Sequence, residues 1–223
     1  MFDYWIQLIR NELIMRKIEI VVIGFLLGAV PIISCFLAGW WISLFFVPES
    51  WIIVFALAGI LAGVIIDILF LKKRIQTAYS MKPIVWMMIY LFYSVGMFGF
   101  FMGVPVFNVI LAVPAGVFVG RWLAHSGADS THMQKVARKV SVFTASILGL
   151  VCIASGSIAL ASCSTASDLQ GMLGLQFQVT PVMIVGIIVG GGTMILALDW
   201  WLTIKSVERA YSYFVAHAKS PSA

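Results

Sequence analysis

Charged residues are scarce in this chain of 223 residues, where Asp, Glu, Lys and Arg together make up 10% of the sequence. Soluble domains carry about 25% charged and about 45–50% apolar residues, whereas 62% of this chain is apolar. A soluble domain of this length still exposes roughly a quarter of its unfolded surface, so its core cannot hide so much apolar area. The composition therefore excludes a soluble globular protein and a disordered chain, and lipid must surround most of the molecule.

Motifs for nucleotide, acyl and zinc chemistry are also missing. The sequence has no Gly-x-x-x-x-Gly-Lys-Ser/Thr loop, no Gly-x-Ser-x-Gly turn and no His-Glu-x-x-His motif. None of the three histidines lies in an apolar run, which excludes a bis-histidine haem inside the membrane. We therefore expect a protein that is not an enzyme and that needs no cofactor.

Cysteine is sparse as well. Cys35, Cys152 and Cys163 show neither Cys-x-x-Cys nor metal-site spacing, and such an odd set is most simply explained as packed thiols. A disulfide between Cys35 and Cys163, both near the outer side of the predicted spans, is the alternative.

Long apolar runs are what the sequence does contain. A helix that crosses a bilayer needs about 20 mostly apolar residues, and six runs meet this length. They cover residues 18–46, 51–71, 83–101, 105–123, 140–162 and 179–203. The sequence thus predicts an all-α integral membrane protein with six transmembrane helices, arranged as three hairpins in one bundle over 18–203. Pro31 should kink the long first span or let it tilt.

The basic residues give the orientation of these spans. All 14 Lys and Arg residues lie before the first span, between spans 2 and 3, between or at the edge of spans 4 and 5, or after span 6. Short cytoplasmic loops collect such residues, which predicts cytoplasmic termini and a cytoplasmic (plasma) membrane location. The net charge of +5 is then explained by attraction to anionic lipid, and no nucleic-acid partner is expected.

The segments outside the spans are a leader, 1–17, and a cytoplasmic tail, 204–223. Phe2, Trp5 and Ile9 recur at helical spacing in the leader with charged residues between them, which predicts an amphipathic helix on the membrane surface. A cleaved signal peptide ending near Cys35 is the alternative. It would leave an odd number of spans, which contradicts the distribution of basic residues.

An internal similarity relates spans 2 and 6. A shift of about 132 positions matches Asp67 with Asp199, Lys73 with Lys205, and Ala78-Tyr79 with Ala210-Tyr211. Repeats of this kind are common in transporters, with the solute site at the repeat interface. Chance similarity between membrane segments is the alternative.

Three charged residues lie inside the predicted spans, where charge is costly and often functional: Asp67, Arg121 and Asp199. Each lies about 24–27 Å from the outer end of its span, so the three are predicted to form one layer near the cytoplasmic edge. Two carboxylates facing one guanidinium leave one negative charge over, which suggests a proton or cation site or a gate. The alternative is that all three side chains reach the interface and hold hairpins together.

Uncharged polar groups and glycines mark a second candidate region. Tyr90, Tyr93 and Ser94 share one face of span 3, and Asn108 lies near the outer side of span 4, so they are candidates for a solute pocket. The alternative is hydrogen bonding between helices. Pro105, Pro114, Gly116 and Gly120 weaken span 4, and the triplet Gly190, Gly191, Gly192 in span 6 predicts either a helix break that exposes backbone groups to a solute or a very close helix contact.

The loop after span 4 holds a weak candidate for a metal site. His125, Asp129 and His132 lie at i, i+4 and i+7, a spacing that brings side chains together on a helix. Gly127 and the small polar residues around it favour a solvated loop instead.

These features predict two functions. The first is a small transporter or permease-like protein for a small solute or ion, using the weakened spans 4 and 6 and the layer of charged residues. The second is a non-catalytic membrane subunit that binds a protein partner or a second copy of itself through small-residue faces and cytoplasmic loops. A substrate-binding component driven by a separate ATPase would combine both.

Overall fold

The computed structural model describes residues 2–101, 103–162, 164–174 and 178–218, and within these ranges the regular elements are all helices. They are α1 (Phe2–Phe46), α2 (Glu49–Gln76), the 3-10 helix η1 (Ala78–Ser80), α3 (Pro83–Phe100), the 3-10 helix η2 (Pro105–Leu111), α4 (Ala112–His125), α5 (Ser130–Ala161), α6 (Thr165–Leu173) and α7 (Pro181–Ala218). Six helical segments are long and apolar enough to cross a membrane, as predicted. The chain is a multi-pass, all-helical membrane protein in contact with lipid.

Three helices extend past the predicted ends of their spans. α1 continues without interruption from the leader into span 1, α5 begins at Ser130 rather than near residue 140, and α7 continues to Ala218 through most of the predicted tail. Lys, Arg, Glu and Gln are good helix formers, so the polar segments beside a span extend the helix. The helices of spans 1, 5 and 6 are therefore longer than the apolar runs that predicted them.

Span 4 changes its helix type along its length. It starts as η2, with Pro105 in the first position, and becomes α-helical at Ala112. Proline is tolerated in a first turn because its missing N–H would have no partner inside the helix there. The predicted weakening of span 4 is therefore found in its first half.

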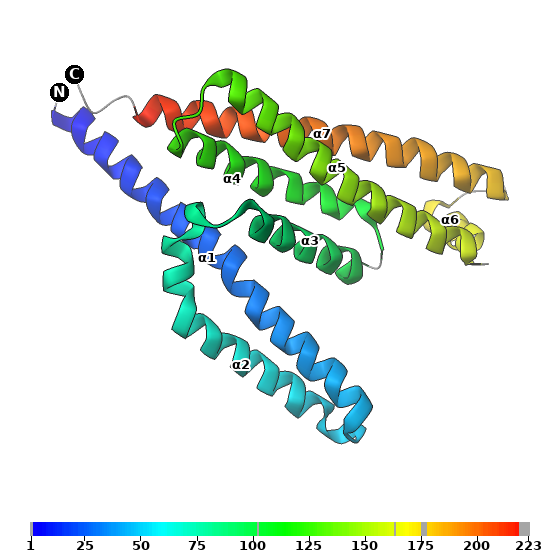
Figure 1. Ribbon diagram of the computed structural model, residues 1–223. Coiled ribbons are helices and arrows are strands. Elements are labelled where there is room, and N and C mark those ends of the chain that lie inside the picture. The colour runs from blue at the N-terminus through cyan, green and yellow to red at the C-terminus, as the bar shows by residue number, and fades with distance from the viewer. Residues whose placement is uncertain (1, 102, 163, 175–177, 219–223) are drawn as a thin grey trace. The chain divides into compact units, whose positions relative to one another are not determined.

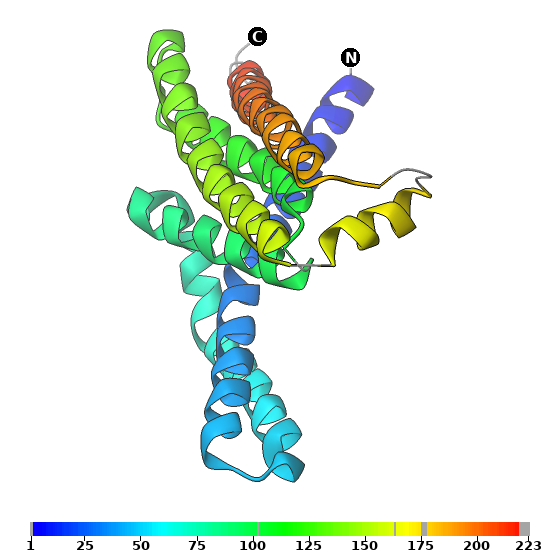
Figure 2. The ribbon, with the colours of Figure 1, turned by 90° about the vertical axis from the view of Figure 1, so that its right-hand side faces the viewer.

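The chain divides into two compact units, Met1–Ile89 and Tyr90–Ala223. In the first unit α1 and α2 run side by side as an antiparallel hairpin (Figures 1 and 2). Their backbones touch at glycines: a Cβ atom on Gly39 would lie 2.5 Å from the Phe55 carbonyl oxygen, and one on Gly63 would lie 2.5 Å from the Ile32 Cα. Small residues allow such close approach of membrane helices, so these glycines fix the hairpin.

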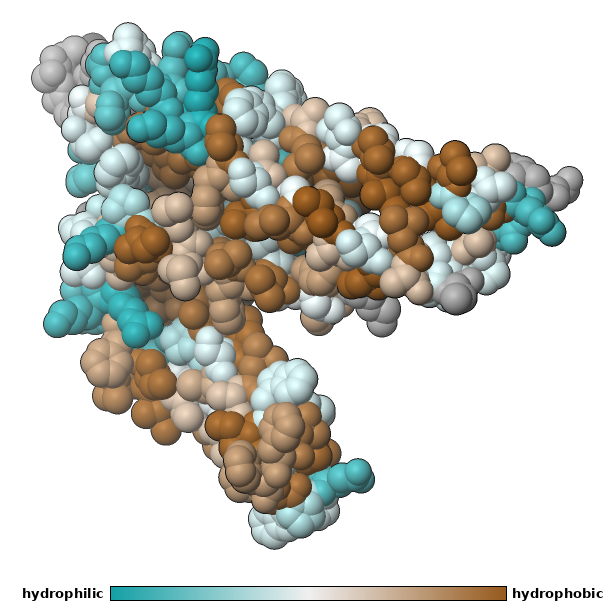
Figure 3. All heavy atoms as spheres, turned by 45° about the vertical axis from the view of Figure 1, so that its right-hand side comes forward, coloured by the Kyte–Doolittle hydropathy of each residue, from teal (hydrophilic) through white to brown (hydrophobic). Residues whose placement is uncertain are grey.

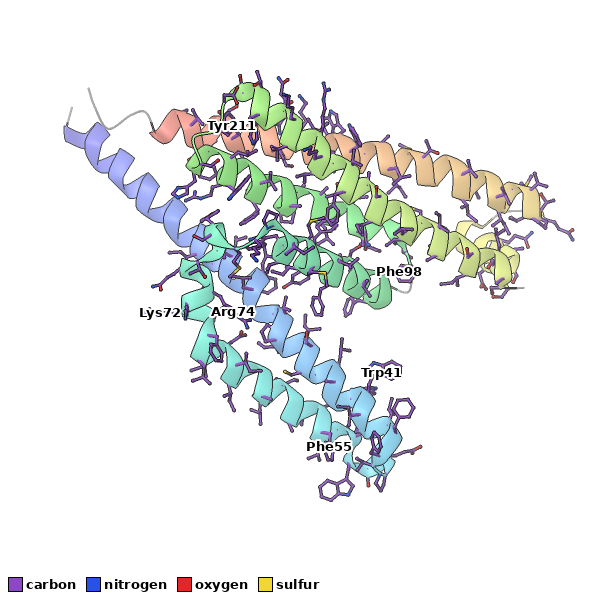
Figure 4. The ribbon with its side chains drawn as sticks, in the orientation of Figure 1. Trp41, Phe55, Lys72, Arg74, Phe98 and Tyr211 are labelled. Atoms are coloured by element: carbon purple, nitrogen blue, oxygen red, sulfur yellow. The ribbon has the colours of Figure 1, made fainter. Side chains whose placement is uncertain are left out.

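The two ends of this hairpin differ in chemistry. Lys72 and Arg74 lie on α2 far from the tip, whereas Trp41 and Phe55 lie close to it (Figure 4). Near the basic end, a buried cluster joins α1, α2 and η1, and the Trp86 indole donates to the Ala78 carbonyl oxygen at 3.1 Å. The cluster is built from Ile23, Leu27 and Ala78, with Leu71, Ile75, Tyr79, Met81, Trp86 and Ile89 packed around it.

In the second unit α7 packs against both α4 and α5. Gly116 of α4 lies against Thr203, and Gly120 lies against Val207, so α4 and α7 are parallel. A Cβ on Gly120 would come within 2.5 Å of the Val207 carbonyl oxygen. The Gly116 and Gly120 pair therefore serves close helix packing, with the small-xxx-small spacing of membrane helix interfaces.

The parts of α5 and α7 beyond the predicted spans pack with the end of α4 around a buried core. It contains Leu123, Met133, Ala137 and Val207. The Tyr211 hydroxyl, labelled in Figure 4, donates to the Ala128 carbonyl oxygen in the connection between α4 and α5. This core holds together the end of the unit where Lys135, Arg138, Lys205 and Arg209 lie.

The surface of both units is mostly apolar. Figure 3 shows brown, apolar side chains along the helices and teal, hydrophilic ones gathered toward helix ends. Large apolar side chains are widely exposed, among them Phe46 at 81% and Val182 at 80%. This surface suits contact with lipid chains.

Residues matched by the internal similarity take corresponding packing positions. Ile75 packs against the buried cluster of the first unit, and its counterpart Val207 lies in that of the second. Ala78 and Ala210 are both buried.

Candidate functional site

Asp199 is the most deeply buried charged side chain in the described part of the chain. Its residue has an exposed fraction of 0%, and neither carboxyl oxygen accepts a hydrogen bond from a described residue. A buried carboxylate without partners is strongly unfavourable, so this position calls for a proton or a cation.

Two threonines lie beside this carboxyl group. The hydroxyls of Thr144 on α5 and Thr203 on α7 lie 3.1 Å apart, and both residues are fully buried. The Thr144 side chain is close enough to Asp199 to interact with it, but the contact does not have the geometry of a hydrogen bond. The site therefore gathers a carboxylate and two hydroxyl oxygens from two helices.

Helical spacing explains why these groups meet. Asp199, Thr203 and Val207 are four residues apart, which places them on one face of α7. On α5 the buried residues Ala137, Ser141, Thr144 and Leu148 form the facing stripe. Thr144 contacts Thr203 while Gly156 lies against Ile188, so α5 and α7 are antiparallel.

A phenol and a thiol complete the surroundings. The charge of Asp199 acts on the Tyr90 hydroxyl of α3 and on the Cys152 thiol of α5. The Tyr90 ring packs at a tilt against Phe143, with ring centroids 5.5 Å apart. Of the four residues predicted to line a solute pocket, Tyr90 is thus placed near Asp199.

Ser94 and Asn108 form a separate polar contact. Asn108 donates through its side-chain amide to the Ser94 hydroxyl at 2.9 Å and to the Ser94 carbonyl oxygen at 3.1 Å. This is the interhelical hydrogen bonding that the alternative interpretation predicted. Tyr93 makes an edge-to-face contact with Phe92, with centroids 5.7 Å apart.

Arg121 and Asp67 are placed differently from Asp199. The Arg121 guanidinium carbon lies 4.2 Å from the centre of the Phe214 ring, a cation–π contact, and Asp199 accepts no hydrogen bond from it. Asp67 belongs to the other unit, where a Cβ on Gly28 would lie 3.3 Å from its Oδ2. A common layer of the three residues stays a prediction.

Within the described residues the glycine triplet of span 6 neither breaks the helix nor packs against a neighbouring helix, so the predicted break is not found, and a close contact with a helix of another chain stays a prediction. α7 is continuous through Gly190, Gly191 and Gly192, and a Cβ on any of them would meet nothing within 4 Å. The same holds for Gly186. Hydrogen bonds within the helix satisfy the backbone here, which leaves a smooth and open face.

The three residues that were weak candidates for a metal site after span 4 do not form a cluster in the structure. The described residues contain no group of three or more His, Cys, Asp or Glu side chains that could hold a metal ion. His125 ends α4, and the chain turns at Gly127, which has a φ of +67°, before Asp129 caps α5 by accepting the His132 N–H. Helical spacing therefore does not extend across the three residues.

Two of the three cysteines lie among the described residues. Cys35 and Cys152 are free thiols. Cys163 lies outside the described residues, and with it the alternative of a disulfide to Cys35.

The chain was compared with protein-family models, curated proteins and solved structures, and none of them matches it.

Proposed function

We propose that the protein is a small membrane transporter that moves a small solute or ion, with Asp199 as the group that binds a proton or cation during transport. The observation that supports this is the complete burial of Asp199 without a hydrogen-bond partner among the described residues. Ionisable groups inside a membrane bundle are rare, and they often mark ion or proton pathways.

The position of Asp199 suits such a role. It precedes Lys205 on α7 by six residues, or about 9 Å along the helix axis, so it lies inside the bundle near the basic end. With the basic ends at the cytoplasmic face, the termini are cytoplasmic and the membrane is a cytoplasmic or plasma membrane. An ion reaching Asp199 would then enter or leave by the cytoplasmic side.

Transport without catalysis is also the chemistry that the site supports. It offers a carboxylate, hydroxyls, a phenol and a thiol, and the described residues contain no group of three or more His, Cys, Asp or Glu side chains that could hold a catalytic metal ion. We therefore propose that the protein is not an enzyme.

Ion flux in liposomes tests the proposal. The full chain is reconstituted with an internal pH dye, and radioactive Na⁺ uptake and proton movement are recorded under imposed gradients. The wild type should exceed protein-free liposomes for at least one ion, and Asp199→Asn should abolish that flux. Glu208→Gln is the matched control, because this carboxylate on the same helix is exposed and pairs with Lys205 at 2.8 Å. Flux that is absent in the wild type, or equal in Asp199→Asn, overturns the proposal.

A second candidate function is that of a non-catalytic membrane subunit that binds a transmembrane helix of a partner protein. Gly186 and Gly190 support it, because they lie four residues apart on α7 and a Cβ on either would meet nothing within 4 Å, whereas Gly39, Gly63 and Gly120 all have a helix against them. Small residues at this spacing are how membrane helices approach closely.

A substitution that fills this face of α7 with a large side chain tests the subunit function. Gly190→Leu should leave the chain folded but remove a partner that co-purifies with the wild type, whereas Gly171→Leu in α6, another open glycine, should retain it. Equal recovery of the partner with both variants would contradict this role.

A further inference from the structure

The two hydroxyls beside Asp199 each have another hydrogen-bond partner. The Thr144 hydroxyl lies 3.2 Å from the Ser141 carbonyl oxygen of its own helix and donates to it. With the Thr144 proton engaged there, the Thr203 hydroxyl is the donor in the 3.1 Å contact between the two threonines, because each hydroxyl has only one proton to donate. In this arrangement both hydroxyl protons have acceptors other than the carboxylate, and neither carboxyl oxygen has a partner that meets hydrogen-bond geometry.

The result is a buried group of oxygen atoms that present lone pairs. Both carboxyl oxygens of Asp199 are unsatisfied, and the Thr203 oxygen keeps its acceptor capacity. Tyr90 and Cys152, the other titratable groups close to Asp199, donate no hydrogen bond to it. Such oxygens repel one another unless a positive charge lies between them.

We propose that Asp199, Thr144 and Thr203 form a binding site for a dehydrated monovalent alkali cation, with Na⁺ as the ion. Hard cations prefer oxygen ligands, and carboxylate with hydroxyl is such a set. One carboxylate balances one positive charge, whereas a divalent ion would leave an excess charge buried in the bundle. Na⁺ needs fewer ligands than K⁺, which suits a site with few oxygens.

The biological role of this sodium site rests on the proposed transport function, and the site specifies Na⁺ as the ion of that function. It also implies an occluded site, because Asp199, Thr144 and Thr203 have no exposed surface. Entry and release would require α5 and α7 to separate at this level, as in the gating of one helix group against another in transporters.

Sodium-dependent stabilisation tests the site independently of transport. The full chain in detergent is unfolded by heat in NaCl, KCl or choline chloride at equal ionic strength and pH 8. Na⁺ should raise the unfolding midpoint in a saturable manner, because a ligand that binds only the folded state stabilises it. K⁺ and choline should have little effect. Asp199→Asn should abolish the response, and Glu208→Gln should keep it.

A pair of threonine variants keeps the test valid should Asp199→Asn fail to fold. Thr203→Val preserves the shape of the side chain but removes its oxygen, so the Na⁺ concentration for half-maximal stabilisation should rise at least tenfold. Thr203→Ser keeps the oxygen and should stay close to the wild type. Equal responses of Val and Ser variants, or a wild type that does not distinguish Na⁺ from choline, overturn the proposal.

Two further outcomes separate this site from the transport function. Stabilisation that follows pH and ignores Na⁺ would show a proton site, which overturns the sodium assignment but leaves transport standing. Saturable Na⁺ binding together with absent flux in liposomes would confirm the site and overturn the proposed transport function.

Discussion

Asn108 and Ser94 tie the 3-10 half of span 4 to α3: the Asn108 amide donates to both the hydroxyl and the carbonyl oxygen of Ser94, at 2.9 and 3.1 Å. Both residues are almost fully buried, with exposed fractions of 2% and 1%. A 3-10 segment of this length has poorer hydrogen-bond geometry than an α-helix, so it needs such an anchor.

Removing the anchor should destabilise the fold. Asn108→Ala loses both hydrogen bonds and leaves the buried Ser94 hydroxyl unsatisfied, which should lower the free energy of unfolding by about 1–3 kcal/mol. Ser94→Ala keeps the carbonyl acceptor and should cost less. Thermal unfolding of the purified protein in detergent measures both, and a Ser94→Ala loss as large as that of Asn108→Ala would contradict the role of the carbonyl contact.

Packed and open glycines should respond to the same substitution with opposite signs. A methyl group at Gly120 would lie 2.5 Å from the Val207 carbonyl oxygen and 2.8 Å from the Ala210 Cβ, so Gly120→Ala should destabilise by about 1–3 kcal/mol. Gly191→Ala meets nothing within 4 Å, and alanine favours the helix by about 0.5–1 kcal/mol. Unfolding midpoints of the two variants should therefore move apart, and a shift in the same direction for both would contradict the packing described.

The span number could be predicted because a membrane helix leaves an apolar run in the sequence, as 83–101 did for α3. The helical extensions at 130–139 and 204–218 could not be predicted, because polar residues occur both in loops and in helices at the membrane surface. A lysine such as Lys139 or Lys205 does not by itself indicate whether its segment is a loop or a helix. The structure shows that both segments are helical. It also shows that they pack together, since Met133 and Val207 lie in one buried core.

Asp199 could be singled out because charge is rare inside a span. Its true neighbours, Thr144 and Thr203, gave no such signal, because threonine in a membrane helix usually bonds to its own backbone. Arg121 was predicted to face Asp199 from its depth alone. Depth does not determine which face of a helix a residue occupies. The structure places the Arg121 guanidinium over the Phe214 ring, and the common layer stays a prediction.

The cap of α5 should give a pH dependence at acid pH. Hydrogen bonds from the Thr131 hydroxyl and then from the His132 N–H hold the pKa of Asp129 below its usual 3.8. A lowered folded-state pKa means that the cap stabilises fully above the unfolded value and is lost as the pH falls through the folded value. Thr131→Val should raise the pKa of Asp129 toward 3.8, as an NMR titration of its carboxyl carbon would measure. An unchanged pKa in Thr131→Val would contradict the hydroxyl contact, and Asp129→Asn should keep the cap without the pH dependence.

The two aspartates matched by the internal similarity should behave differently despite that match. Asp67 is partly exposed and the positive charge of Arg74 acts on it, although its Oδ1 atom is buried without a hydrogen bond from a described residue. Asp199 is fully buried, and both of its carboxyl oxygens lack such a bond. Asp67→Asn should therefore keep the sodium-dependent rise in unfolding midpoint that Asp199→Asn loses. In liposomes, Asp67→Asn should retain the ion flux and Asp199→Asn should abolish it. Because both substitutions remove one carboxylate from a span, each is the control for the other, and a loss of the sodium response in Asp67→Asn as well would contradict the assignment of that response to Asp199.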